Sequence, residues 1–207
     1  MMPHSNNDML HDVHNYGCYT NTREIFLHNH HAFDENPGVE YKMSNIFIKN
    51  LRSLEVESHD EITVHMHSIG GEWADGMAMF DGIKMCHSKV SIIVYGQAES
   101  MSSIILQAAT RRLLTPHSYF MVHNGMSGIS GEYRNVQNWI NFEQKIFDQM
   151  LDIYAERCCR GKFFKEKEYD QDKTKKYLIK KFKDGDWYME PEEAVYYGFA
   201  DRVVNKW

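Results

Sequence analysis

A β-branched run at residues 90–95 (VSIIVY) is the feature that most limits what this 207-residue chain can fold into. Such a run is typical of a strand that is buried on both faces of a parallel sheet. The alternating pattern at 61–67 (EITVHMH) and the run at 119–123 (YFMVH) indicate further strands. Helical spacing predicts helices over about 72–87 and 101–109. This alternation predicts an α/β domain with a largely parallel sheet and right-handed crossovers.

The chain is long enough for one domain with a hydrophobic core, and no change of composition marks a boundary inside it. Residues 1–22 are expected to be a flexible N-terminal segment, and the domain is expected to span 23–207. From residue 135 to about 160, a helical pattern carries apolar residues on two faces, which predicts that a partner chain covers part of it. The charged residues 161–185 are expected to form a linker or a peripheral helix.

Composition excludes several classes of protein. The formal charge of −6 disfavours nucleic acid binding, because phosphate neutralisation needs clustered Lys and Arg residues. No apolar stretch approaches the ~20 residues that a membrane span needs, and residues 1–14 lack the apolar core of a signal peptide. The four cysteines show no CxxC spacing, so reduced thiols in a cytoplasm are expected. Surface histidines are favoured over a metal site at His28, His30 and His31, and we expect no metal and no cofactor.

The first segment suited to catalysis is residues 68–71 (SIGG), which follow a strand and precede a helix. Two glycines at such a turn let the backbone approach a ligand and direct N–H groups toward it. The turn can therefore supply half of an oxyanion hole. Most Gly-Gly turns after strands are only structural, so this segment alone decides nothing.

The second and third segments supply a serine and a histidine. Gly96 is expected to end the buried strand, which leaves Ser100 at the N-terminus of the next helix, where the helix dipole favours a developing oxyanion. The alternative is that Ser100 only caps the helix. His123 ends the YFMVH strand and could take the proton of a serine hydroxyl, although a structural role is the alternative for any single histidine.

Together and in this order, these segments resemble the proteolytic subunit of the Clp protease. Residues 68–71 are similar to the family's Ser-Pro-Gly-Gly, and residues 96–101 (GQAESM) to its Gly-x-Ala-Ala-Ser-Met, with the family's spacing between them. Residues 116–125 (PHSYFMVHNG) are similar to its Pro-Asn-Ser-x-x-Met-Ile-His-Gln-Pro segment. Residues 186–201 resemble the segment that begins at the family's acidic residue. The resemblance covers about residues 23–204 and is strongly specific.

The resemblance implies a ClpP/crotonase-like fold of stacked ββα repeats, with a mostly parallel sheet and a protruding handle at about 124–160. It also implies a serine endopeptidase that cleaves unfolded polypeptides or peptides by acyl transfer. In that mechanism Ser100 attacks the scissile carbonyl, His123 accepts and returns the proton, and Asp186 orients His123. The implied oxyanion hole is formed by the backbone N–H groups of Gly71 and Met101.

The resemblance further implies how substrates and partners bind. Residues 125–131 (GMSGISG) resemble the family's glycine-rich strand, which pairs with substrate through its backbone and tolerates many sequences. The residues expected to bind substrate are Gly70, Gly125, Met126, Ser127, Gly128 and Ile129. The implied assembly is a homo-oligomer of two stacked heptameric rings, fed by a hexameric AAA+ unfoldase, in a bacterial or infected-host cytoplasm.

Departures from the family's pattern leave alternatives. Asp184 is a rival to Asp186 for the acidic role, because the charged segment before it is longer than the family's. Glu99 replaces an alanine beside Ser100, and we expect it to favour the protonated form of His123 or to alter substrate choice. A crotonase-type acyl-CoA enzyme is the alternative function, followed by an inactive ring subunit and a relative of the signal-peptide peptidases.

Overall fold

The computed structural model describes residues 6–27 and 38–206. In this part of the chain the central sheet has the strand order β1-β2-β3-β4-β5-β8, with β6 pairing β4 and β7 pairing β6. Strands β2, β3, β4, β5, β6 and β8 pair in parallel, whereas β1 and β7 pair antiparallel at the margins. The predicted α/β fold with a mostly parallel sheet is confirmed. The strands are β1 (Cys18–Tyr19), β2 (Glu24–Leu27), β3 (Ile62–Ser68), β4 (Val90–Glu99), β5 (Arg111–Leu114), β6 (Tyr119–Val122), β7 (Trp187–Met189) and β8 (Arg202–Val203).

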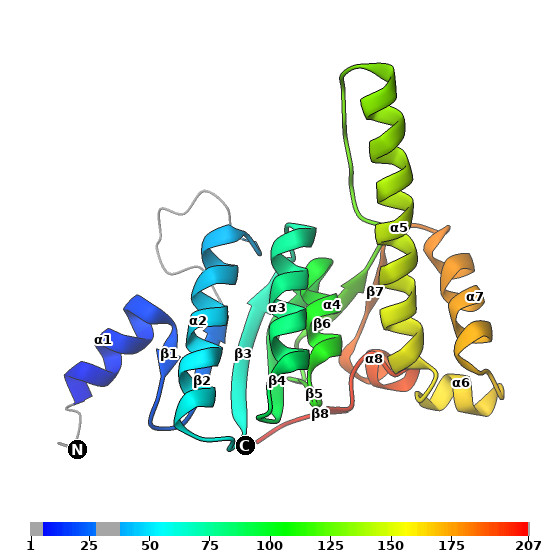
Figure 1. Ribbon diagram of the computed structural model, residues 1–207. Coiled ribbons are helices and arrows are strands. Elements are labelled where there is room, and N and C mark those ends of the chain that lie inside the picture. Colours follow the sequence, from blue (N-terminus) through cyan, green and yellow to red (C-terminus); the bar gives the residue numbers. More distant parts are fainter. Residues whose placement is uncertain (1–5, 28–37, 207) are drawn as a thin grey trace.

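The helices cover the sheet in a row that ends at a tall projection. Figure 1 shows α2, α3 and α4 side by side in front of the strands, with α5 rising beyond α4. Each of these helices packs on its neighbour, so the sheet and the row of helices enclose one core. The helices are α1 (Asn6–Tyr16), α2 (Tyr41–Glu57), α3 (Trp73–Met85), α4 (Met101–Ala108), α5 (Tyr133–Cys158), α6 (Lys162–Glu166), α7 (Gln171–Phe182) and α8 (Pro191–Tyr197).

Strand β4 lies at the centre of the sheet and has both of its faces covered. Val90, Ile92 and Val94 point to one face and Ile93 to the other, and all four side chains are buried. This is the environment that the run of β-branched residues predicted, because such residues fit a pleated surface that is packed from both sides.

Gly96 bends β4 but does not end it, so that expectation was wrong. Gly96 has a φ of 61°, in the left-handed region that favours glycine, and the strand continues to Glu99. Beyond the bend β4 leaves β5 and pairs with β6, with Glu99 opposite Met121. The bend therefore carries the end of β4, and Ser100 after it, toward β6.

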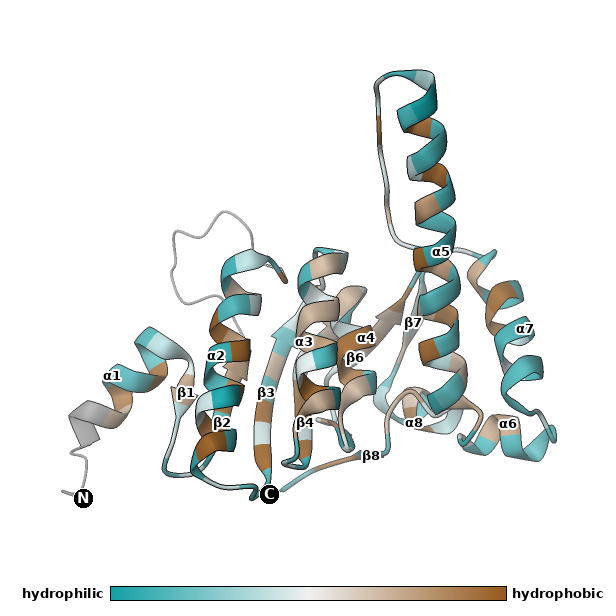
Figure 2. Ribbon diagram, viewed as in Figure 1, coloured by the Kyte–Doolittle hydropathy of each residue, from teal (hydrophilic) through white to brown (hydrophobic). Residues whose placement is uncertain are grey.

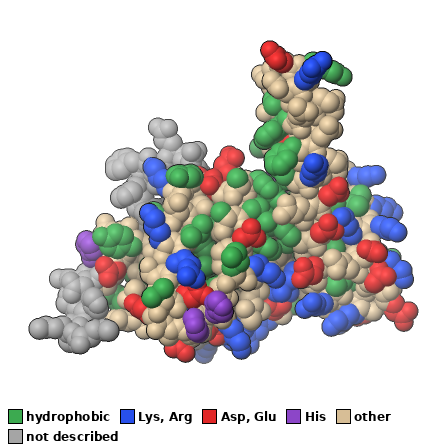
Figure 3. Space-filling model, in the orientation of Figure 1, with side chains coloured by type: hydrophobic (Ala, Val, Ile, Leu, Met, Phe, Trp, Pro, Cys, Tyr) green, Lys and Arg blue, Asp and Glu red, His purple; other side chains and the backbone are tan. Residues whose placement is uncertain are grey.

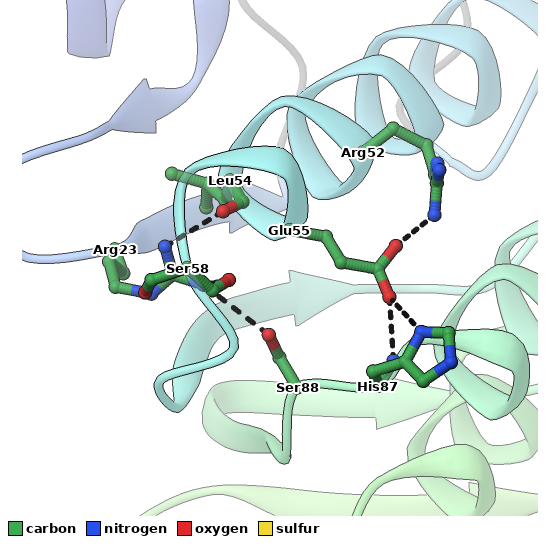
Figure 4. Close-up of polar contacts among 7 residues, drawn as sticks. All are labelled: Arg23, Arg52, Leu54, Glu55, Ser58, His87 and Ser88. Carbon is green, nitrogen blue, oxygen red and sulfur yellow. Dashed lines mark hydrogen bonds and ion pairs between the residues drawn. The ribbon is translucent and has the colours of Figure 1, made fainter.

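Two polar clusters fix the C-terminal end of α2 to the segments that immediately precede β2 and β4 (Figure 4). Glu55 is buried and accepts hydrogen bonds from the backbone N–H of His87 at 2.6 Å and from His87 Nδ1 at 2.9 Å, and it also pairs with Arg52. These bonds lower the pKa of Glu55 to about 2. Arg23, at the start of β2, donates to the carbonyl oxygens of Leu54, Ser58 and Asp60.

Helix α5 has a lower part that packs on the body and an upper part that projects from it. The extended segment before α5 runs alongside the projection in Figure 1, and we call the two together the handle. Hydrophobic residues recur along the projecting part of α5 in Figure 2, and Figure 3 shows hydrophobic side chains exposed along one side of it. The exposed hydrophobic residues of the handle are Met126 and Ile129 in the extended segment and Tyr133, Trp139, Ile140 and Phe142 in α5.

Two regions contain more regular structure than the sequence analysis assigned. Within residues 1–22, expected to be flexible, the structure has α1 and β1, and Gly17 connects them with a φ of 62°. Residues 161–185 form the two helices α6 and α7, and α7 packs on α5. The N-cap of α7 is Asp170, whose side chain accepts a hydrogen bond from the N–H of Lys173 at 2.8 Å.

Candidate active site

Ser100 lies in the sharp turn between β4 and α4. Its φ of 50° and ψ of −123° place it among only three non-glycine residues with positive φ in the described part of the chain. Ser100 occupies the N-cap position of α4, but its side chain makes no capping hydrogen bond. The interpretation of Ser100 as a simple N-cap is therefore wrong, and the strained backbone turns the hydroxyl away from the helix.

The turn can form only because glycine stands opposite it. Gly70 has a φ of 94°, and a Cβ at this position would lie 2.6 Å from the Cβ of Ser100 and 2.8 Å from the N of Met101. Ser68 supports the same segment, since its Oγ accepts from the N–H of Gly70 at 3.3 Å and from the Oγ of Ser102 at 2.7 Å. No local pattern marks this buried serine pair, because its two members lie 34 positions apart.

His123 is in direct contact with the Ser100 hydroxyl. Its Nε2 lies 2.7 Å from Ser100 Oγ, a hydrogen-bond distance. The pairing of β4 with β6 explains the contact, because Glu99 is opposite Met121 and the next residues of both strands converge beyond that pair. The N–H of Ser100 also donates to the carbonyl oxygen of Met121 at 3.0 Å, which fixes the turn to β6.

Asp186 lies on the other side of the His123 ring. Strand β7 pairs antiparallel with β6, with Trp187 opposite Val122, so the residue before β7 lies beside the residue after β6. Asp186 Oδ1 is 3.5 Å from His123 Nδ1, and 53% of the Asp186 side chain is exposed. Asp184 is part of the turn after α7, where its N–H donates to the carbonyl oxygen of Lys181 at 3.1 Å. The structure therefore places Asp186 next to the histidine.

The backbone N–H groups of Gly71 and Met101 border the serine. The N–H of Val39 donates to the carbonyl oxygen of Gly70, and the N–H of Glu72 donates to that of Val39. Because strand residues alternate in direction, the N–H of Gly71 then points away from Val39. Met101 is the first residue of α4, where an N–H has no acceptor within the helix.

Glu99 places a second carboxylate close to this cluster. Burial raises the pKa of Glu99; the charge of His123 opposes that shift, and the charge of Asp186 adds to it. The same carboxylate raises the pKa of the exposed Tyr188 on β7. Glu99 is thus electrostatically linked to the histidine and the aspartate, whereas its effects on His123 and on substrate choice stay predictions.

Helix α5 is connected to the turn through a buried serine and tyrosine. Ser103 Oγ donates to the carbonyl oxygen of Ser100 at 2.5 Å and lies 2.6 Å from the hydroxyl of Tyr154, which is fully buried. Tyr154 lies in the part of α5 that packs on the body. The base of the handle is therefore hydrogen-bonded to the backbone of the strained residue.

The glycine-rich segment expected to bind substrate leaves this cluster and follows α5. It was expected from the sequence to act as a strand, but it forms none here, because no strand within residues 6–27 and 38–206 pairs with it. Met126 is 96% exposed, and Ser127 Oγ accepts a hydrogen bond from Trp139 Nε1 at 3.0 Å. Of the predicted substrate residues, Gly70 lies directly against the Ser100 turn.

Metal and membrane interpretations find no support in the part of the chain that the structure describes. Within residues 6–27 and 38–206, no group of three or more His, Cys, Asp or Glu side chains could hold a metal ion. The cluster of His28, His30 and His31 lies outside the described residues. No helix in those ranges is long and apolar enough to cross a membrane.

The Ser100 hydroxyl lies in a strained turn and contacts His123, which Asp186 flanks on its other side. On a mostly parallel α/β sheet, this arrangement is that of the serine hydrolases. The family model of the Clp protease matches residues 13–207, so the chain belongs to the Clp protease family and is a serine-type endopeptidase. It is similar to the ATP-dependent Clp protease proteolytic subunit of Deinococcus radiodurans, with 29% identity over 171 residues that cover 81% of this chain and 77% of that protein. The resemblance found in the motifs is confirmed, and the acyl-CoA alternative is excluded.

Proposed function

We propose that this peptidase cleaves peptide bonds with Ser100 as nucleophile, His123 as general base and Asp186 as the residue that orients His123. The observation that carries the proposal is the 2.7 Å contact between Ser100 Oγ and His123 Nε2, made by a serine whose backbone is strained. A serine hydroxyl is a poor nucleophile until a base removes its proton. This contact supplies the base at hydrogen-bond distance.

In the first half of the reaction, Ser100 Oγ attacks the scissile carbonyl carbon while its proton passes to His123 Nε2. The negative charge on the carbonyl oxygen is stabilised by the N–H groups of Gly71 and Met101, each worth about 2.7–4 kcal/mol in such sites. His123 then gives the proton to the leaving amine, and the C–N bond breaks to leave an acyl-enzyme. In the second half a water molecule loses a proton to His123 and attacks the ester, which frees the acid and restores Ser100.

The segment with Gly125, Met126, Ser127, Gly128 and Ile129 would bind the substrate backbone. Its extended conformation and its exposure support this role, because an extended segment without a partner strand can pair with an extended peptide. Main-chain pairing reads little of the side-chain sequence. We therefore expect a broad specificity, which suits the degradation of unfolded polypeptides.

The handle would join two heptameric rings of this chain into a chamber, and a hexameric AAA+ unfoldase would feed polypeptides into it. Exposed hydrophobic side chains along the handle support the first part, since contiguous apolar surface on a projecting element is typical of a protein interface. The name of the Deinococcus relative describes that protein as ATP-dependent, which supports the second part. A cytoplasmic location fits the four free cysteines of this chain.

Labelling with a fluorophosphonate tests the nucleophile. Intact-mass analysis should show a single adduct on the wild type and none on Ser100→Ala, and kcat/KM for a fluorogenic peptide should fall by a factor on the order of 10⁶. Ser102→Ala is the matched control, because Ser102 is bonded to Ser68 and not to His123, and it should still be labelled. An assembled wild type that takes no label would contradict the proposal and favour an inactive ring subunit.

A pair of Asp→Asn variants tests the acidic residue. Asp186→Asn should lower kcat by about 10²–10⁴-fold, because an amide favours the wrong tautomer of the histidine. Asp184→Asn, in the turn two residues earlier, should keep nearly the wild-type kcat. The reverse ranking of the two variants in steady-state kinetics would assign the role to Asp184.

A further inference from the structure

A cavity of about 620 Å³ lies apart from the Ser100 site, where the end of α5, α6 and α8 meet β5 (Figure 1). None of its lining residues belongs to the cluster of Ser100, His123 and Asp186. Five cationic side chains line the cavity, against two carboxylates, so it has an excess of positive charge. The cations are Arg112, Arg157, Arg160, Lys162 and Lys165.

The two carboxylates pair with two of the five cations and offset only part of the positive charge. Asp201 Oδ1 is 2.5 Å from Arg112 Nη2, and its Oδ2 accepts from the N–H of Arg112 at 2.7 Å. Glu166 accepts a hydrogen bond from the hydroxyl of Tyr196 at 2.9 Å and lies 3.8 Å from Lys162 Nζ. The lining therefore holds three more cations than carboxylates, Arg157, Arg160 and Lys165, with Asp201 also acting on the charge of Arg157.

The fold holds two of the lining guanidinium groups in place, that of the buried Arg112 and that of the half-buried Arg157. Arg112 is only 5% exposed, and the Nη2 of Arg157 donates to the carbonyl oxygen of Ala109 at 2.9 Å. Among the residues that the structure describes, the Nε atoms of both arginines are buried without a hydrogen-bond partner. Burial, together with the charge of Arg112, lowers the pKa of Arg157. Because like charges that the fold holds close together repel one another, the cavity favours the entry of an anion that can accept hydrogen bonds.

We propose that this cavity binds a phosphate-type oxyanion, with Arg157 and Arg160 as its main ligands and Lys162 and Lys165 at the entrance. Guanidinium groups match the geometry of phosphate oxygens and bind them through charge-assisted hydrogen bonds. The volume exceeds that of one phosphate ion, so free phosphate, a short polyphosphate and the diphosphate of a nucleotide all share the required chemistry. The anion joins the end of α5 to α6, and its binding stabilises that corner of the body.

Titration calorimetry and thermal unfolding of the full chain with inorganic phosphate, at an ionic strength held constant with chloride, test the proposal. Saturable binding and a raised unfolding temperature are expected for the wild type. Arg157→Gln and Arg160→Gln should each weaken binding by about tenfold or more. Arg160 is exposed, so that variant keeps its fold if Arg157→Gln does not. The matched control is Arg134→Gln at the opposite end of α5, which loses the same charge and should bind like the wild type.

Parallel titrations with tripolyphosphate and adenosine diphosphate distinguish the sources of the phosphoryl group. The anion that binds most tightly, and whose affinity falls most in Arg157→Gln and Arg160→Gln, identifies the ligand. Equal affinity of the wild type and both variants, or no saturable binding of any of the three anions, overturns the proposal. A change of oligomeric state in the variants without anion binding overturns it too, because a carboxylate of a second copy would then fill the cavity.

Discussion

The body around Ser100 and the handle use glycine in opposite ways. In the body, a Cβ at Gly70 would lie 2.6 Å from the Cβ of Ser100, and one at Gly71 would lie 2.1 Å from the carbonyl oxygen of Val39. In the handle, a Cβ would meet no described atom within 4 Å at any of Gly125, Gly128 and Gly131. Glycine in the body thus permits close packing around the site, whereas glycine in the handle leaves an open surface.

Helix α5 crosses both environments and shows what the difference means. Its lower part buries Met150, Leu151, Tyr154, Ala155 and Cys158 in the body, whereas Trp139, Ile140 and Phe142 on its upper part are 38%, 53% and 50% exposed. The same helix therefore carries one set of apolar residues that stabilises the fold and another that this chain leaves uncovered. The lower part of α5 should therefore determine the stability of the fold, and the upper part should determine how the chain associates with a second copy.

The largest effect should come from deleting a side chain in the lower part of α5. Leu151→Ala should lower the free energy of unfolding by about 2–5 kcal/mol, because Leu151 is fully buried and its truncation leaves a cavity. Ile140→Ala, on the upper part, should change the unfolding of the dissociated chain by less than about 0.5 kcal/mol. Denaturant unfolding followed by circular dichroism measures both values.

Sedimentation of the same two variants completes the test. Ile140→Ala should shift the assembly toward single rings or monomers, whereas Leu151→Ala should assemble normally wherever it is folded. If Ile140→Ala assembled like the wild type and instead destabilised the dissociated chain as strongly as Leu151→Ala, the separation of fold and association along α5 would be wrong.

A smaller effect on stability is expected from adding a methyl group at matched glycines. Gly70→Ala should destabilise the fold by about 1–3 kcal/mol, because the new Cβ overlaps backbone atoms and the φ of 94° disfavours alanine. Gly128→Ala adds the same group on the handle in open space and should change the free energy of unfolding by less than about 0.5 kcal/mol. Equal losses in urea denaturation would mean that close packing does not distinguish the two regions.

Much of the body was predictable from local patterns. The run at 90–95 predicted a strand buried on both faces, because that feature depends on a short segment. The cluster of Ser100, His123 and Asp186 joins distant segments, and it was expected only because several motifs together resemble one family. Gly96 was misjudged because a glycine at positive φ can bend a strand as well as end it, and only the partner strand β6 decides which.

Features that join distant positions could not be predicted from one sequence. The contacts of Ser102 with Ser68 and of Tyr154 with Ser103 connect residues 34 and 51 positions apart, and no local pattern marks them. The cationic cavity likewise collects residues from β5, α5 and α6 that look like ordinary surface charges in the sequence. Periodicity reports which face of an element is buried, but it does not report what lies against that face.

The smallest of these effects concerns Glu99, the carboxylate beside Ser100. Burial raises its pKa above the ordinary value of 4.5, with an opposing effect of the charge of His123 and a further increase from the charge of Asp186. A carboxyl with a raised folded-state pKa stabilises the fold while it is protonated, below pH 4.5. That contribution is lost as the pH rises through the raised pKa, because the ionised form is disfavoured in the folded state.

Glu99→Gln removes this ionisation, so the variant should be more stable than the wild type at neutral pH. The gain should be smaller than the losses expected for Leu151→Ala and Gly70→Ala. The gain should shrink as the pH falls and vanish below 4.5, where Glu99 is protonated in both states. Glu132→Gln, exposed on the handle, loses the same charge without the burial and should show no such trend. Urea unfolding at a series of pH values measures the difference between each variant and the wild type. The opposite trend, in which the stability of Glu99→Gln relative to the wild type rises as the pH falls, would mean that the folded protein favours the ionised carboxylate. Glu99 would then assist His123 by its charge without a cost in stability.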